Sequence, residues 1–176
     1  MRHADQESFR DFAVLHAASL RRSAFLFCGD WHLAEDLMQA TLIKVYRSWA
    51  RVQKHDSLAN YGRTVLLRTW LDEKRRPWRR SEHSAADVPE SPDPSADPAA
   101  SAHRSWVRDV VHQALLRLPP RQRAAVVLRY FDDLSVAETA AVMGCSHGTV
   151  KSQTARGLET LRGTVVRLPV AEGVLS

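Results

Sequence analysis

Apolar side chains recur along this chain three or four residues apart with charged side chains between them, which is the period of amphipathic helices. In the first stretch they begin with Phe9 and Phe12, and the pattern predicts a helix that ends at Gly29. Asp30 can cap a second helix, Trp31 to about Trp49. The inward stripe of that second helix is predicted to be Ala34, Leu37, Thr41, Val45 and Trp49.

A third helix is predicted from about Leu58 to Arg76, and it differs from the first two in being strongly cationic. Aromatic side chains lie among its positive charges, including Tyr61 and Trp70, and the basic run continues to Arg80. Cations can follow the backbone of single-stranded DNA while aromatic rings receive unstacked bases, so the composition favours such a ligand. For Trp70 a place in the core and a stacking role are both open.

Residues 81–102 break the helical pattern. Four prolines interrupt them, few large apolar side chains are present, and the segment is predicted to be a flexible linker. It carries five acidic residues and no Lys or Arg; because the whole chain has a net charge of +5, the remainder carries +10. The folded parts are therefore basic, which suits a polyanionic partner.

Helical spacing resumes near His103 and continues to Leu118, and the proline pair at 119–120 can start a supporting helix. The pattern as a whole predicts an all-α protein with two small helical domains, residues 1–80 and 103–166. The flexible acidic linker 81–102 joins them, and a short tail, 167–176, follows.

Two further helices are predicted to meet at a tight turn. Ser135 followed by Glu138 is typical of a capping box at the start of a helix. Gly144 supplies a left-handed residue that ends this helix, and Ser146 can cap a second one running to about Arg162. Two short helices capped in this way indicate a helix-turn-helix.

The second helix of this unit carries polar side chains on the face and in the half that enter the major groove in such motifs. Lys and Arg can reach phosphates or guanine edges, Gln can pair with adenine, and Ser is adaptable. A merely solvated face is the alternative. The side chains in question are Lys151, Ser152, Gln153 and Arg156.

The stretch LPPRQR, VVLRYFDDLS and MGCSHGTVKSQTARGLETLR resembles the promoter-binding C-terminal domain of bacterial sigma factors. Within the sigma-70 family it is similar to the small extracytoplasmic-function (ECF, group 4) sigma factors, including the actinobacterial SigE-like subgroup. The stretch FCGDWHLAEDLMQATLIKVYRSW is similar to the sigma-factor helix that docks on the clamp coiled coil of RNA polymerase core. The resemblance extends over nearly the whole chain outside the linker.

The resemblance implies three groups of site residues, carried across by position. Core polymerase binding is implied for Glu35, Asp36 and Gln39. Recognition and melting of the downstream, minus-ten promoter element are implied for Tyr61, Arg63, Arg68, Trp70, Asp72, Arg75 and Arg76. Recognition of the upstream, minus-thirty-five element is implied for Ser146, Thr149, Lys151, Ser152, Gln153 and Arg156.

The implied function is that of an alternative sigma factor, with core RNA polymerase (clamp coiled coil and flap) and promoter DNA as partners and an anti-sigma factor as a further candidate. No catalytic constellation or cofactor loop is found in the sequence, so an enzyme is not predicted. Cys28 and His32 have the spacing of a helical metal pair, but a buried thiol is the ordinary interpretation and no metal is expected. No apolar run reaches membrane-spanning length, so a cytoplasmic protein is expected, at the nucleoid through RNA polymerase. A free-standing helix-turn-helix repressor or activator is the competing hypothesis.

Overall fold

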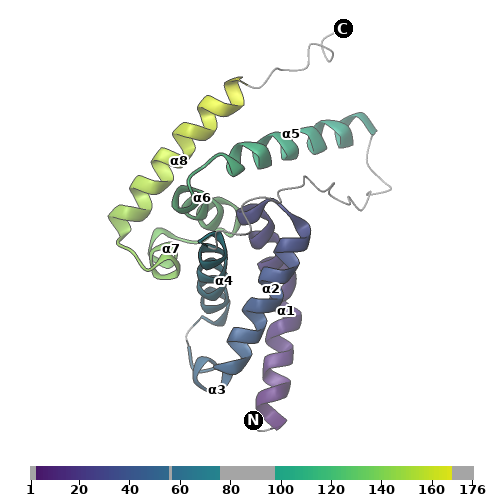
Figure 1. The fold of residues 1–176 in the computed structure, drawn as a ribbon, viewed down its shortest axis with the longest axis vertical. Helices are drawn as coiled ribbons and strands as arrows, with labels where there is room; N and C mark the ends of the chain where they lie inside the picture. Colours follow the sequence, from purple (N-terminus) through teal and green to yellow (C-terminus); the bar gives the residue numbers. More distant parts are fainter. Residues whose placement is uncertain (1–2, 56, 76–97, 168–176) are drawn as a thin grey trace.

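A computed structural model describes residues 3–55, 57–75 and 98–167, and all regular structure in these ranges is helical. In chain order the elements are α1 (His3–Cys28), α2 (Trp31–Arg47), α3 (Trp49–Val52), α4 (Leu58–Lys74), α5 (Pro98–Leu116), α6 (Pro120–Val126), the π-helix η2 (Val127–Phe131), α7 (Val136–Met143) and α8 (His147–Arg167). Figure 1 shows α1 to α4 grouped toward the N-terminus and α5 to α8 grouped at the opposite end.

The N-terminal half is a bundle of α1, α2 and α4. Asp30 caps α2 as predicted, because its carboxylate accepts a hydrogen bond of 2.7 Å from the backbone N–H of Leu33. Every predicted inward position from Ala34 to Trp49 is buried. The helix is shorter than predicted, however: α2 ends at Arg47, and Trp49 belongs to the separate single turn α3.

The C-terminal half contains the predicted helix-turn-helix, α7 and α8. Ser135 and Glu138 form the capping box, with both reciprocal hydrogen bonds present. Gly144 ends α7 with φ of 62°, in the left-handed region. Ser146 accepts from the backbone N–H of Thr149 at 3.1 Å, which caps the start of α8. The turn chemistry of this unit was therefore predictable from the sequence.

The supporting helix before this unit differs from the prediction. It starts at Pro120 as expected, but after Val126 it continues as a π-helix, in which each turn holds an additional residue. The chain then reverses at Asp133, whose φ of 54° lies in the left-handed region that Asp tolerates better than most residues. The π-helix changes the direction in which the residues after it point.

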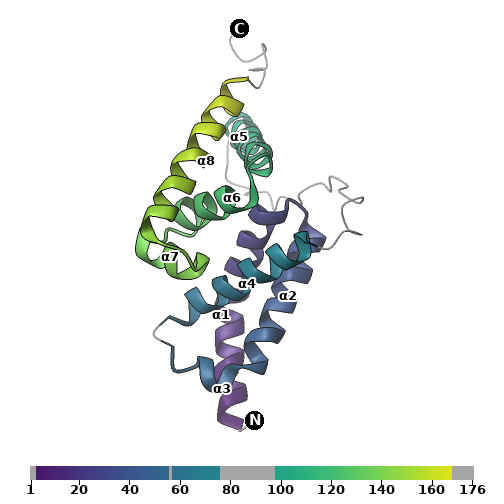
Figure 2. The ribbon, with the colours of Figure 1, turned by 60° about the vertical axis from the view of Figure 1, so that its left-hand side comes forward.

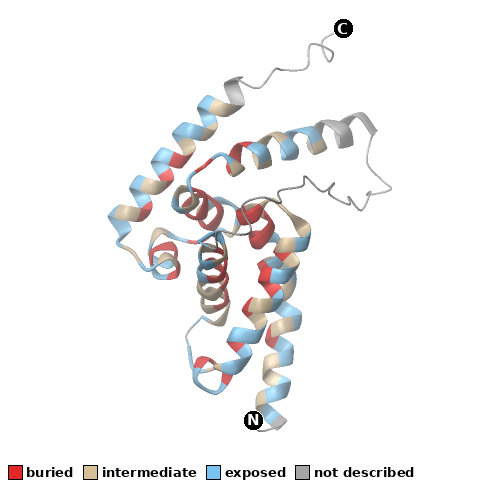
Figure 3. Ribbon diagram, in the orientation of Figure 1, coloured by how far each residue is buried: buried red, intermediate tan, exposed pale blue. Residues whose placement is uncertain are grey.

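The two halves are packed on each other, and one apolar core runs through both of them. Its buried members include Leu20, Leu66 and Trp70 from the N-terminal half and Leu115 and Leu128 from the C-terminal half. Buried residues concentrate where α1, α4 and α6 meet, as Figure 3 shows. At Gly29 the approach is so close that an added Cβ would lie 2.7 Å from Cδ2 of Leu116. The sequence predicted two domains but not this shared core.

The helix after the predicted linker begins earlier than expected. We predicted its start near His103, whereas α5 begins at Pro98, inside the range assigned to the linker. Proline is tolerated in the first turn of a helix, because its missing N–H has no intrahelical partner there. The remaining predicted linker residues, 81–97, and the tail from 168 lie outside the described residues, as does Arg76.

Candidate nucleic-acid interface

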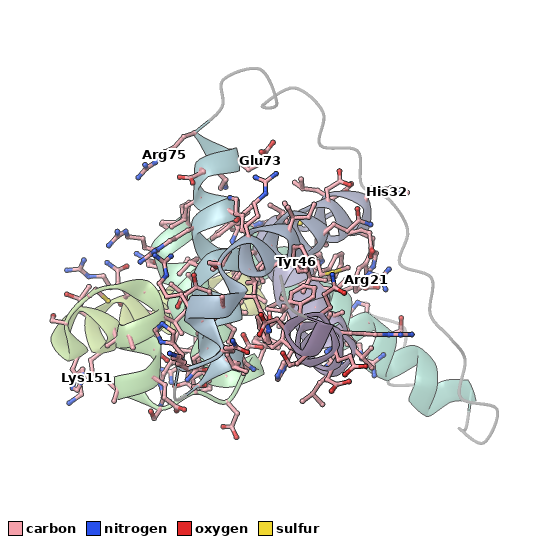
Figure 4. All side chains as sticks on the ribbon, turned by 90° about the horizontal axis from the view of Figure 1, so that it is seen from below. Arg21, His32, Tyr46, Glu73, Arg75 and Lys151 are labelled. Carbon is pink, nitrogen blue, oxygen red and sulfur yellow. The ribbon has the colours of Figure 1, made fainter. Side chains whose placement is uncertain are left out.

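The first candidate surface is the N-terminal half of α8. Lys151, Ser152 and Arg156 are exposed, and Gln153 is half-buried. In Figure 4 the Lys151 side chain projects outward from the helix, away from the rest of the molecule. Thr149 is half-buried, and its hydroxyl lies 2.9 Å from that of Ser146, so these two side chains organise the start of the helix. Five of the six predicted upstream-reading residues therefore lie within the first three turns of α8 (His147–Arg167), and Ser146 directly precedes the helix.

The opposite face of α8 holds that surface in place. Val150 is fully buried, and Gly157 lies against α6, where an added Cβ would be 2.7 Å from Cγ2 of Val126. Thr154 is buried with no hydrogen-bond partner for its hydroxyl. The sequence did not mark Gly157 as a packing residue, although a small residue in mid-helix is a usual signal of close helix approach.

The second surface is α4, and here the predicted residues do not all lie together. Arg68, Asp72 and Arg75 are exposed and, at intervals of four and three, share one face with the half-buried Tyr61. Figure 4 shows Arg75 at the outer end of this helix. Arg63 and Trp70, seven residues apart, share the other side of the helix. The candidate strand-binding face of α4 therefore consists of Tyr61, Arg68, Asp72 and Arg75.

The sequence left two roles open for Trp70, a place in the core or stacking on a base, and the structure places its ring in the core. Its ring is 1 % exposed and stacks on Phe27 with ring centroids 4.9 Å apart. The guanidinium of Arg123 and the ammonium of Lys74 lie 5.6 and 5.5 Å from the ring centroid. A fully buried ring presents no face to a base, so this arrangement favours the core role for Trp70. Tyr61, on the opposite side of the helix, is the other aromatic residue of α4.

The third surface is the outer face of α2, where core polymerase binding was predicted. Asp36 and Gln39 are exposed and three residues apart, so they lie side by side. Glu35 is half-buried and forms an ion pair of 2.8 Å with Arg21 on α1. Gln39 also donates to Glu35 at 3.4 Å. Arg21, which the sequence did not indicate, thus fixes one member of this acidic group.

A group of polar side chains connects the two halves beside α4. The carboxylate of Asp132 lies 3.5 Å from the Arg63 guanidinium and accepts a hydrogen bond of 2.8 Å from Ser23. The amide of Asn60 donates to Glu138 at 3.4 Å. Burial raises the pKa of Asp132, while its hydrogen bond from Ser23 and the charge of Arg63 oppose that rise. The Arg63 guanidinium is therefore already paired with a carboxylate of the same chain, that of Asp132.

A second connection is made by Arg123, which is 4 % exposed. Its guanidinium donates to the backbone carbonyls of Phe27, Leu116 and Leu118, and burial lowers its pKa to about 10. A buried cation is costly unless its donors are satisfied, and here carbonyl oxygens from both halves accept from the two terminal nitrogens, whereas the buried Nε has no hydrogen-bond partner. Arg123 therefore stabilises the packed arrangement of the two halves.

Comparison with known proteins gives matches to both halves. Residues 13–80 match the family described as Sigma-70 region 2, and residues 108–161 match Sigma-70, region 4. The chain is 32 % identical over 162 residues to the RNA polymerase sigma-E factor of Streptomyces avermitilis, covering 92 % of this chain and 87 % of that protein. Its identity to the sigma-E factor of Streptomyces coelicolor is 34 % over 162 residues, covering 90 % and 86 %.

A solved structure shares the fold. The sigma factor RpoE from Bartonella quintana, crystallised with the anti-sigma factor NepR, superimposes with a TM-score of 0.74 at 24 % identity, covering 92 % of this chain and 98 % of that one. Within the described residues no group of three or more His, Cys, Asp or Glu side chains could hold a metal ion. The helices that the structure describes include none long and apolar enough to cross a membrane.

Proposed function

Because the chain belongs to the sigma-70 family, as an extracytoplasmic-function sigma factor, we propose that its three surfaces divide the work of promoter recognition. As a sigma factor it directs RNA polymerase to promoters. We assign duplex reading of the upstream element to α8, contact with the unpaired downstream strand to α4, and docking on core polymerase to α2. With polymerase as its partner, it acts in the cytoplasm and contributes no catalytic residue of its own.

The observation that carries the assignment is the open polar face of α8. Its cations and amide stand on the half of the helix nearest the turn, where Lys151 and Arg156 are exposed and Ser146 caps the first turn. A major groove of about 12 Å admits such a helix, and Lys, Arg and Gln offer the hydrogen bonds that distinguish base edges. This face supports sequence-specific duplex binding.

The α4 surface supports a different mode of binding. Arg68 and Arg75 are exposed on the face that carries Asp72, and Tyr61 lies on the same face with its ring centroid 5.2 Å from that of His55. Cations can follow one DNA strand, and stacking of a base on an aromatic ring contributes about 1–3 kcal/mol. Unpairing and flipping a base costs a few kcal/mol, so one ring with nearby cations can offset much of it. We therefore assign strand capture to this face, with Tyr61 as the stacking ring.

The experiment that tests the function is run-off transcription with core polymerase on a promoter library. The wild-type chain is expected to start transcripts from a subset of promoters. A chain that only represses from duplex sites would give none.

Docking through α2 is tested by charge reversal at Asp36. Asp36→Arg should weaken assembly with core by roughly fivefold or more, since a rim charge of the wrong sign opposes association, and it should leave the melting temperature unchanged because the site is exposed. Asp11→Arg, an exposed acid on α1, is the control. Equal core affinity for both variants would remove Asp36 from the interface.

A further inference from the structure

We propose that Arg21 on α1 is a positioning residue for core docking: it holds Glu35, and through Glu35 it orients Gln39 so that α2 presents hydrogen-bond acceptors to core polymerase. The inference rests on the proposed function, because it concerns the docking surface assigned to α2. Figures 1 and 2 show α1 and α2 side by side in two orientations, so a long side chain of one helix can reach the face of the other.

The Arg21 guanidinium is held by two side chains of α2. Its Nε lies 2.8 Å from Oε2 of Glu35, and its Cζ lies 4.8 Å from the centroid of the Trp31 ring. Trp31 and Glu35 are four positions apart on α2, so they lie one turn apart on the same face. The guanidinium therefore bridges two positions of α2 rather than pairing with a single carboxylate.

The Trp31 ring gives this contact a rigid base. It stacks on the ring of Phe25, with centroids 3.9 Å apart and planes inclined by 5°. Phe25 is buried and lies one turn after Arg21 on α1. An ion pair at the surface is usually weak, because two long side chains lose conformational freedom to form it. A guanidinium that already stacks on a fixed ring has less freedom to lose, so it holds Glu35 more firmly than an isolated arginine would.

Glu35 transmits this constraint to the docking surface. Its other oxygen, Oε1, accepts a hydrogen bond of 3.4 Å from Nε2 of Gln39, one turn further along α2. Both carboxylate oxygens of Glu35 therefore have a partner within the chain, and the side chain is half-buried. The exposed carboxylate of Asp36 is more accessible to polymerase. Glu35 thus acts through Gln39 instead of contacting polymerase itself.

The direction of the hydrogen bond between Gln39 and Glu35 decides what Gln39 can offer. The amide nitrogen donates to a carboxylate, which can only accept, so the amide oxygen remains available to a donor on the partner. Asp36, three positions earlier, is also an acceptor. These two exposed side chains consequently fit a surface of core polymerase that supplies N–H donors, above all those of arginine or lysine.

The positioning group lies far from the DNA-reading face of α8. In Figure 4 Arg21 and His32, the residue after Trp31, lie toward one side of the molecule, whereas Lys151 of α8 lies at the opposite edge. A change at Arg21 is therefore expected to alter the affinity for core polymerase and to leave duplex binding by α8 unchanged. General destabilisation of the chain would instead lower both.

The test measures the affinity of the full chain for core polymerase after single and paired substitutions. Arg21→Gln and Glu35→Ala should each lower this affinity about threefold to fivefold, because each leaves the Gln39 side chain unconstrained. The double variant should bind no more weakly than either single variant, and Arg21→Gln should have no further effect in a Gln39→Ala background. Arg21→Lys, which keeps the charge, should recover part of the loss. Arg10→Gln, which removes an exposed cation from α1, is the control and should match the wild type.

The double variant has the same net charge as the wild type, so it separates positioning from two simpler effects. If Arg21 only offsets the charge of Glu35, Arg21→Gln should strengthen binding to a cationic partner, and the double variant should restore the wild-type affinity. If both residues contact polymerase directly, the two losses should add. Either result, or equal affinity of Arg21→Gln and the wild type, would overturn the positioning role.

Duplex binding and the Asp36→Arg variant keep the remaining outcomes distinct. A loss of core affinity in Arg21→Gln accompanied by an equal loss of duplex binding would indicate destabilisation and would also overturn the positioning role. If Asp36→Arg weakens assembly with core and Arg21→Gln does not, only the positioning role fails. If Asp36→Arg assembles with core as tightly as the wild type, the docking surface assigned to α2 fails, and the positioning role fails with it.

Discussion

The two candidate DNA-reading helices, α8 and α4, resemble each other in composition but differ in their surroundings. Both carry cations on a polar face. On α8 the exposed cations Lys151 and Arg156 belong to one open face, and the other half of the molecule does not reach it. On α4 the cations divide: Arg68 and Arg75 are exposed, while Arg63 is paired with Asp132 from the other half. A residue's assignment to DNA thus depends on tertiary contacts that composition does not reveal.

The largest expected effect concerns Trp70, which supports α4 from inside. Trp70→Ala should lower the free energy of unfolding by about 3–5 kcal/mol, because it leaves a large cavity beneath Phe27 and Arg123. Urea denaturation measures this loss, with Trp70→Phe as the conservative control. A normal midpoint for Trp70→Ala combined with failure to open promoters would return Trp70 to the stacking role.

A smaller effect is expected at the packed face of α8. Gly157→Ala places a methyl group 2.7 Å from Cγ2 of Val126, so it should destabilise the protein by about 1–3 kcal/mol and weaken upstream duplex binding. Gly163→Ala is the matched control in the same helix, since nothing lies within 4 Å of its added methyl group. The control should be neutral or stabilise by up to about 1 kcal/mol, from helix propensity. Equal melting temperatures for the two variants would contradict the close packing of α8 on α6.

The open face of α8 is tested directly at Arg156. Arg156→Ala should cost about 1–3 kcal/mol and relax preference at one base position if the guanidinium contacts a guanine edge. If it contacts phosphate, binding should weaken for all sequences, and the slope of the logarithm of the binding constant against the logarithm of the salt concentration should decrease in magnitude by about one. Titrations on promoter variants at several salt concentrations separate these cases. Arg162→Ala, which changes an exposed arginine further along α8, is the control. Equal effects of the two changes on DNA binding would contradict the assignment of Arg156 to the recognition face.

The smallest expected effect is a pH dependence of the stability of the packed arrangement of the two halves. Burial lowers the pKa of His112 from its ordinary value of 6.5, and the charge of Arg123 adds to this, while the Phe25 carbonyl and Asp109 oppose it. A lowered pKa means that protonation of His112 is disfavoured in the folded, packed structure. This structure should therefore be most stable above pH 6.5 and lose stability as pH falls below that value.

Comparison with His112→Asn isolates this contribution. The pKa of His16 is also lowered, by burial and by the charge of Arg63, but His16 is present in both proteins and its effect cancels. Melting temperatures of the two proteins should converge or cross as the pH is lowered from 7.5 to 5.5. Parallel profiles of melting temperature against pH for the two proteins would show that protonation of His112 does not contribute to the pH dependence.

What the sequence predicted well was local. The caps at Asp30, Ser135 and Ser146 and the left-handed Gly144 were all found as predicted, because each depends on residues within four positions of itself. The inward stripe of α2 was predictable for the same reason. The end of α2 was not, since Ser48 interrupts a pattern that continues through Trp49.

What the sequence did not predict depends on distant contacts. The partner of Arg63 is 69 positions away at Asp132, and helical periodicity carries no information about it. The π-helix at Val127–Phe131 has no composition signal, and it decides where Asp132 points. The core role of Trp70 required knowledge of Phe27 and Arg123 as its neighbours. The prolines near α5 were interpreted as a linker, although Pro98 starts a helix.

The most direct test of the division between the two surfaces is permanganate footprinting of a promoter with wild-type protein and core polymerase. If α8 reads duplex DNA and the N-terminal half captures an unpaired strand, reactive thymines should appear in the downstream element and none in the upstream element. If no thymine becomes reactive while the protein alone represses from duplex sites, the assignment of strand capture to α4 is contradicted.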